Sequence, residues 1–173
     1  GIIHAGKDGN VVLIAPNISN SGIIQTDGGT ITLAAGEELS IASMADPSIR
    51  FQVQAPENQA LNLGELLANG GVINIFAGQI SNSGAINANA VDVDANGQIN
   101  LVAVSDITLT DTSVVTADGE QGDGGAINIS NTDGTVRNTG VITADSSTNN
   151  GGAISLTGDW FGLGGTISAS GEQ

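Results

Sequence analysis

The sequence has no cysteine and almost no aromatic residues, which make up 2% of its 173 residues. Without cysteine there can be no disulfide framework, thiolate metal site or thiol nucleophile. No apolar run approaches the roughly twenty residues that a membrane-spanning helix requires. No charged-then-apolar leader opens the sequence either. We therefore expect a soluble excerpt of a longer chain, without a membrane span.

Basic residues are also scarce, since only Lys7, Arg50 and Arg137 oppose 18 acidic residues and the formal net charge is −15. A strongly negative chain repels other polyanions. The charge therefore excludes nucleic acid and anionic membrane surfaces as partners.

Glycine and aliphatic residues are plentiful by contrast, with 26 glycines and a hydrophobic content of 39%. A chain this rich in aliphatic residues does not have the composition of a disordered protein. Its length fits one domain, and we expect a single folded segment over residues 1–173.

Two short templates alternate along the chain, and both begin with glycine. The first continues with any residue, an aliphatic residue, any residue and a small residue; it occurs at GIIHA (1), GIIQT (22), GELLA (64), GAINA (84), GVITA (140) and GTISA (165), with SVVTA (113) as a variant. The second alternates aliphatic and polar residues, at GNVVL (9), GTITL (29), GVINI (71), GQINL (97), GAINI (125) and GAISL (152). A third short element follows them. Aliphatic residues at every second position are typical of β-strands.

These repeats predict a parallel β-helix of about seven coils, each with three short strands around an aliphatic interior. The predicted period is about 23 residues if the stretch from Gly22 to Gly64 holds two coils. Ile73, Ile99 and Ile127 should then share one interior environment. A lone coil could not offset its conformational entropy, so stability must come from stacking.

The phrase ISNSG occurs at 18–22 and again at 80–84, and we interpret it as one corner of two coils. Its isoleucine would be buried, its glycine would give the backbone freedom, and its Asn and Ser side chains would bond nearby backbone. Matching asparagines on strands should also form ladders, namely Asn74, Asn100 and Asn128.

Four segments interrupt the pattern. Residues 43–60 contain two of the three prolines and predict an excursion from the coils. The stretch AVDVDANG at 90–97 predicts an extra short strand. Two polar corners, ADGEQGDGG at 117–125 and ADSSTNNGG at 144–152, fall at equivalent positions and should protrude on one side.

No residue of the chain makes a convincing catalytic site. Asp92 and Asp94 share a face, as the carboxylates of β-helical polysaccharide lyases and hydrolases do, but no basic residue accompanies them. His4 is the only histidine and is expected to face solvent. We predict that the chain is not an enzyme and binds no cofactor.

Two sets of residues are candidates for binding. Asp118, Glu120 and Asp123 offer three carboxylates on one loop, which suits calcium, although their spacing matches no specific calcium loop. Four more side chains are candidates for contact with a partner, either a glycan or a protein: Trp160, Phe161, Arg50 and Phe51. For the aromatic pair, packing under a loop or a missing neighbour is the simpler interpretation.

The phrases LIAPNISNSG, TLAAGEELSI and ALNLGELLANGG resemble the repeats of filamentous haemagglutinin-like exoproteins, the bacterial adhesins of two-partner secretion. The resemblance covers most of the chain. It implies a right-handed helix, export through an outer-membrane β-barrel transporter, and an extracellular place at the bacterial cell surface. The amino-terminal secretion domain of that family carries an Asn-Pro-Asn-Gly motif, which is absent here. We therefore expect a segment of the repeat region, either interior or next to the secretion domain.

The sequence thus favours a non-catalytic rod segment of a secreted adhesin, whose receptor is a host or bacterial surface protein or glycan. Two alternatives stay open. One is a glycan- or calcium-binding module that acts through the loops at 43–60 and 117–125. The other is a β-helical polysaccharide-degrading enzyme.

Overall fold

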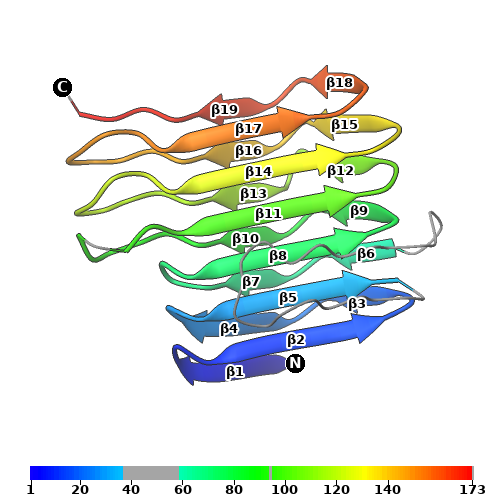
Figure 1. Ribbon diagram of the computed structural model, residues 1–173, viewed down its shortest axis with the longest axis horizontal. Helices are drawn as coiled ribbons and strands as arrows, with labels where there is room; N and C mark the ends of the chain where they lie inside the picture. Colours follow the sequence, from blue (N-terminus) through cyan, green and yellow to red (C-terminus); the bar gives the residue numbers. More distant parts are fainter. Residues whose placement is uncertain (37–58, 94, 173) are drawn as a thin grey trace.

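The chain winds into six stacked coils and the first strand of a seventh (Figure 1). The computed structural model describes residues 1–36, 59–93 and 95–172. Nineteen strands and no helix form over these residues. The described part of the chain therefore has no helix that could cross a membrane. The predicted all-β parallel solenoid is confirmed.

Three parallel sheets form the three sides of the solenoid. Sheet A contains β1 (Ile2–Lys7), β4 (Ile23–Asp27), β7 (Glu65–Leu67), β10 (Ala85–Asn87), β13 (Val114–Thr116), β16 (Val141–Thr143) and β19 (Thr166–Ser168). Sheet B contains β2 (Asn10–Ala15), β5 (Thr30–Ala35), β8 (Val72–Ala77), β11 (Gln98–Ala103), β14 (Ala126–Asn131) and β17 (Ala153–Thr157). Sheet C contains β3 (Ile18–Asn20), β6 (Gln59–Asn62), β9 (Gln79–Asn82), β12 (Ile107–Leu109), β15 (Thr135–Asn138) and β18 (Trp160–Leu163). Coil 1 is β1 to β3, and each later coil repeats that order up to coil 6, which is β16 to β18.

Each strand pairs with its equivalents in the coils below and above, so like residues stack in columns. Ile73, Ile99 and Ile127 face one another in register on sheet B, and all three are fully buried. Leu66, Ile86 and further aliphatic residues of sheet A form a matching interior column. Stacking removes each aliphatic side chain from water above and below as well as sideways, which is why the interior is dry.

Most of the glycines that open the templates are required by the close approach of successive coils. A Cβ on Gly64 would collide with the carbonyl oxygen of Gly22, and a Cβ on Gly84 with that of Gly64. On the second template, a Cβ on Gly125 would meet the carbonyl oxygen of Gly97. The repeated glycines therefore mark the start of the strands in sheets A and B, where backbone touches backbone.

The repeated phrase ISNSG occupies one corner of the solenoid, as predicted. Ile18 and Ile80 are buried in the same column of sheet C, with Ala60 between them. The asparagines of this corner form a buried ladder: the amide of Asn20 donates to Asn62 (2.9 Å), and that of Asn62 donates to Asn82 (2.8 Å). Amide and backbone groups are thus satisfied inside the corner.

The predicted outer ladder is also present on sheet B, where Asn100 donates to Asn74 (2.9 Å) and Asn128 donates to Asn100 (3.0 Å). The coil count needs one correction. β4 pairs directly with β7, with Ile24 opposite Leu66, so the stretch from Gly22 to Gly64 is one coil and not two. The additional residues lie between β5 and β6, and the predicted excursion at 43–60 falls almost entirely outside the described residues.

Candidate functional site

The two polar corners predicted to protrude stack on each other beside the solenoid, at the left in Figure 1. Gly119 forms parallel bridges with Ala90 below and Ser146 above. We call this layer the wing and define it as the described residues of 88–97, 117–125, 144–152 and 169–172. Coil 3 has only a short turn at the same corner, so the wing begins with coil 4. The sequence predicts an extra strand at 90–97, but among the described residues of this stretch only Ala90 forms a bridge.

Small side chains fill the inner side of the wing. Ala88, Ala90, Ala117 and Ala144 are buried there, and so is Ser146. The Ser146 hydroxyl donates to the carbonyl of Gly122 (2.7 Å) and accepts a hydrogen bond from the backbone N–H of Asn149 (2.9 Å). The wing thus depends on hydrogen bonds more than on apolar packing.

One column of side-chain oxygens joins the coils of the wing. Asn89 accepts from the backbone N–H of Asp118 (2.8 Å), and Asp118 accepts from that of Asp145 (2.7 Å). Asp145 in turn accepts from the backbone N–H of Ser170 (2.6 Å). Each coil therefore presents an acceptor to the next one.

A hydroxyl accompanies each carboxylate in this column. Thr143 donates to Asp118 (3.0 Å), and Ser168 donates to Asp145 (2.7 Å). The bond from Ser168 is the main cause that lowers the pKa of Asp145, with smaller contributions from the N–H and hydroxyl of Ser170, while partial burial opposes them. Asp145 is therefore held as a carboxylate.

The lower end of the column lacks this second bond. Thr116 occupies the position equivalent to Thr143, but the acceptor below it is Asn89. Its hydroxyl oxygen is buried and has no hydrogen-bond partner among the described residues. An amide has one acceptor oxygen where a carboxylate has two, and that oxygen already binds Asp118.

The predicted calcium residues lie in the wing but do not form one cluster. Both carboxylate oxygens of Asp118 accept bonds from coil 6, and Asp123 accepts from the N–H and amide of Asn150 (3.1 and 3.3 Å). Glu120 is exposed, and its backbone carbonyl accepts from the hydroxyl of Ser147 (2.8 Å). Within the described residues no three acidic or histidine side chains gather around one point. Calcium binding by these residues remains a hypothesis, which calorimetry with calcium would test.

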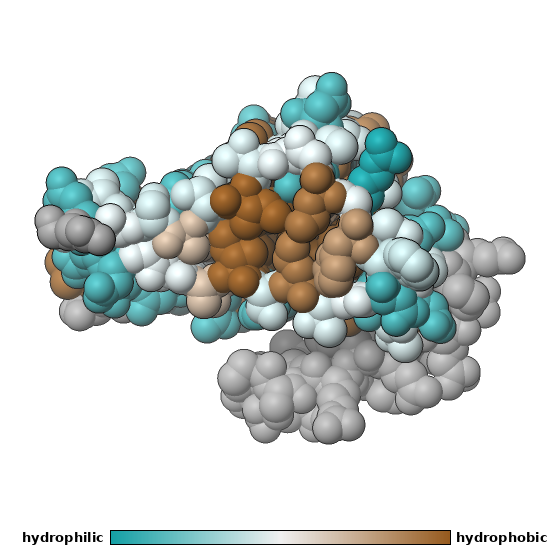
Figure 2. Space-filling model, turned by 90° about the horizontal axis from the view of Figure 1, so that it is seen from above, coloured by the Kyte–Doolittle hydropathy of each residue, from teal (hydrophilic) through white to brown (hydrophobic). Residues whose placement is uncertain are grey.

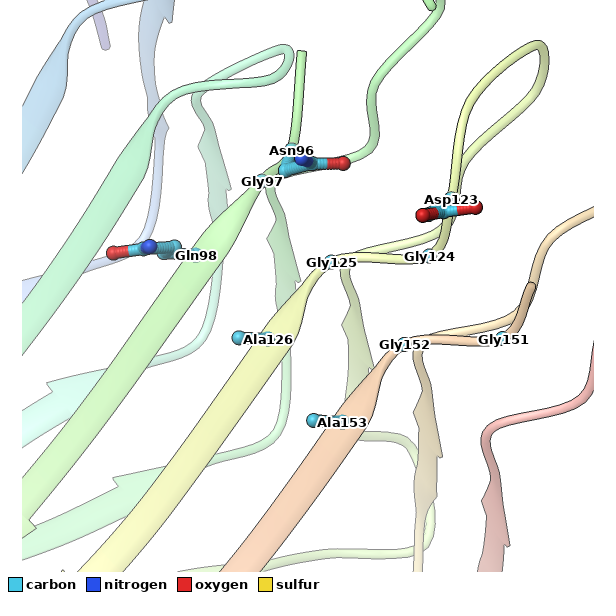
Figure 3. Close-up of a pocket in the computed structure, with 10 residues that line it drawn as sticks. All are labelled: Asn96, Gly97, Gln98, Asp123, Gly124, Gly125, Ala126, Gly151, Gly152 and Ala153. Carbon is cyan, nitrogen blue, oxygen red and sulfur yellow. The ribbon is translucent and has the colours of Figure 1, made fainter. Parts of the chain in front are cut away.

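A shallow hollow of about 390 Å³ lies where the wing joins sheet B (Figure 3). Its floor is backbone and methyl groups of three successive coils, and Asn96, Gln98 and Asp123 stand at its rim; the floor residues are Gly97, Gly124, Gly125, Ala126, Gly151, Gly152 and Ala153. Close stacking already explains Gly125 and Gly152. We assign no ligand to this hollow.

Other candidate residues lie apart from the wing column or outside the described part. Asp92 is exposed at the first coil of the wing, and its predicted neighbour Asp94 is not among the described residues. His4 is exposed on β1, in register with Gln25, as predicted. Arg50 and Phe51 also fall outside the described residues.

The two aromatic candidates have different environments on β18. Phe161 stacks in register on Val136, which is fully buried, so Phe161 occupies an interior position. It is 44% exposed because the described residues do not cover it from above. Trp160 stacks on Thr135, faces outward and is 74% exposed. The alternation of interior and exterior positions along β18 thus separates two residues that the sequence treats alike.

The end face of the solenoid that carries β17, β18 and β19 has an apolar centre. Seen from above, hydrophobic side chains gather at the centre of the cross-section and polar ones surround them (Figure 2). The interior positions of this last layer are only partly covered: Ile154, Leu156, Phe161 and Ile167. Sequence periodicity marks these residues as interior, but only the stacking order shows that they form the uppermost layer of the described residues.

One solved structure is similar to this chain over its whole length. It is the crystal structure of the HMW1 secretion domain from Haemophilus influenzae, with a TM-score of 0.88 and 34% sequence identity. The match covers 100% of this chain and 50% of the other, so the chain spans about half of that structure. No family model and no curated protein matches the chain.

Proposed function

The chain belongs to the two-partner secretion exoproteins, and on this premise we propose that it is a non-catalytic β-helical part of a secretion domain. The observation that carries the proposal is the 34% identity, over the whole length of this chain, to the HMW1 secretion domain. A partner outer-membrane transporter would export the polypeptide, and the β-helix would lie outside the cell.

We infer that the chain lies within the secretion domain and not in the repeat region. The missing Asn-Pro-Asn-Gly motif predicts the repeat region, whereas the likeness is to a secretion domain. The likeness extends over about half of the matched domain, and a motif outside the shared half would not be seen in this chain.

The test is export of the polypeptide that contains this chain, expressed with and without its transporter. We expect the polypeptide in the medium only when the transporter is present. A variant with Ile99→Asp and Ile127→Asp, which places charges in the dry interior, should lose export or be degraded on arrival. A matched variant with Asn100→Asp and Asn128→Asp alters the outer face of the same strands and should be exported. Equal secretion without the transporter would refute the proposal.

We also propose that Trp160 contributes to adhesion, the role expected of an adhesin segment. Its indole is the most exposed large apolar side chain of the described residues, and an exposed aromatic ring can stack on a sugar or on a protein partner. Trp160→Ala should reduce attachment of the protein to the host or bacterial surface that carries its receptor. Arg137→Ala, which alters an exposed residue one coil below on the same sheet, should leave attachment unchanged. If Trp160→Ala attaches as well as the unchanged protein, Trp160 does not contribute to adhesion.

Absence of catalysis is the remaining part. Incubation of the chain with neutral and acidic polysaccharides should release neither reducing ends nor unsaturated products. Release of either product would favour the enzyme alternative and would direct attention to Asp92, whose carboxylate is exposed.

A further inference from the structure

Side-chain oxygens of one coil accept backbone N–H groups of the next coil at several corners. Amide oxygens do this in the lower part of the solenoid, where Asn10 binds the N–H of Thr30 (3.1 Å) and Asn89 binds that of Asp118 (2.8 Å). Carboxylates take the same role higher up; these are Asp106 with Thr135, Asp118 with Asp145, Asp123 with Asn150 and Asp145 with Ser170. The geometry is alike, but only the upper acceptors can be titrated.

We propose that the upper wing is an acid-sensitive element: protonation of its carboxylate acceptors loosens the contacts from coil 5 upward, while the contacts made through the amide acceptors Asn10 and Asn89 stay closed. A hydrogen bond to a carboxylate is roughly twice as strong as one to a neutral acceptor. A protonated acid also presents an O–H where a donor now points, as the Thr143 hydroxyl does toward Asp118. Amide acceptors do not change over the same range.

The charged groups around the column are all acidic. Asp145 is faced by Ser168 and Ser170 from above and by Asp118 from below. The charged side chains of the described wing are Asp92, Asp118, Glu120, Asp123, Asp145 and Glu172. Their mutual repulsion falls on acidification and would tighten the wing, so it acts against the proposed loosening.

The pKa of Asp145 indicates which effect wins at this residue. It is lowered from the ordinary value of 3.8, so the folded coil favours the carboxylate despite its acidic neighbours. A group of this kind stabilises the fold above its unfolded pKa, and that contribution is lost as the pH falls through the lower folded pKa. The loosening should therefore begin near pH 4 and grow below it.

The experiment is amide hydrogen exchange of the full chain, followed by NMR from pH 7 to about pH 3, with each rate divided by that of an unstructured chain at the same pH. Protection of the Asp145 and Ser170 amides should fall about five- to tenfold more than that of the Thr30 and Asp118 amides. The latter two donate to Asn10 and Asn89 and serve as internal controls.

Two variants exchange the chemistry within the column. Asp145→Asn keeps an amide acceptor of the kind that Asn89 provides. It should abolish the extra loss of protection at the Ser170 amide on acidification, while the loss at the amide of residue 145 remains. Asn89→Asp should create such a fall at the Asp118 amide and give the buried Thr116 hydroxyl an acceptor. The proposal is overturned by an equal fall at all four amides, by no fall at Ser170, or by a fall at Ser170 that persists in Asp145→Asn.

Discussion

The body of the solenoid and its wing use the same stacking of coils but are held together by different forces. In the body, every coil repeats aliphatic columns such as Ile73, Ile99 and Ile127, which are fully buried. In the wing, the buried side chains are alanine and serine, and the coils are joined by single oxygens such as those of Asn89, Asp118 and Asp145. Burial of large aliphatic groups contributes more per residue than an exposed hydrogen bond.

This difference teaches that one repeat can carry two levels of stability. The body should unfold as a cooperative whole, since each coil covers its neighbours. The wing should open locally, because few apolar contacts oppose that opening. Four substitutions test the contrast, beginning with the one of largest effect.

Removal of one body residue should destabilise the whole solenoid. Ile99→Ala leaves a cavity between Ile73 and Ile127 that the columns cannot close, and the free energy of unfolding should fall by about 2–5 kcal/mol. Denaturant unfolding followed by circular dichroism measures it. A loss below about 1 kcal/mol would mean that the interior is loosely packed.

A methyl group at the junction of body and wing should also be costly. Gly125→Ala places a Cβ against the carbonyl oxygen of Gly97, so coils 4 and 5 must separate, at about 1–3 kcal/mol. Gly162→Ala is the control, since its Cβ would meet only the flexible side chain of Arg137 at an ordinary distance. Similar stability of the two variants would contradict the role of close coil contact.

The buried corner ladder gives an intermediate case, because it is polar but belongs to the body. Asn62→Leu deprives Asn20 of its acceptor and Asn82 of a donor inside the corner, which should cost about 1–3 kcal/mol. Leucine itself is tolerated in this column at Leu109, so side-chain size is not the cause. The control is Asn100→Ala on the outer ladder, which water can rescue, with a change of less than about 0.5 kcal/mol.

The smallest global effect is expected from the wing. Ser146→Ala removes the hydroxyl that binds Gly122 and Asn149, so amide exchange should accelerate across 117–125 and 144–152 by about tenfold, corresponding to about 1.4 kcal/mol. The denaturant midpoint of the body should stay the same. A shift of that midpoint equal to the one in Ile99→Ala would show that wing and body form a single cooperative unit.

Much of this fold could be predicted because its local pattern and its global arrangement agree. Alternation of aliphatic and polar residues identifies the interior positions, and repeated glycines identify the start of strands. The number of coils between Gly22 and Gly64 could not be predicted, since an insertion and an additional coil have the same length in sequence. The direct pairing of Ile24 with Leu66 decides it.

The candidate residues show the same division. Spacing alone groups Asp118 with Glu120 and Asp123 as a loop of carboxylates, whereas the fold commits Asp118 to coil 6 and Asp123 to Asn150. Trp160 and Phe161 are neighbours in sequence, but only one of them points outward. Contacts between coils join residues far apart in sequence, for example 20 positions between Asn10 and Thr30 and 42 between Asn20 and Asn62, and no local signal reports them.

The sequence by itself determined that this protein is a stack of parallel coils with an aliphatic interior and glycine-marked strand starts, because periodicity and steric demand are properties of short segments. Only the tertiary structure decided which polar side chains meet between coils, as Asn89, Asp118 and Asp145 do in the wing. The reason is that a hydrogen bond requires two groups within about 3 Å of each other, and that distance depends on how each coil settles on the one below.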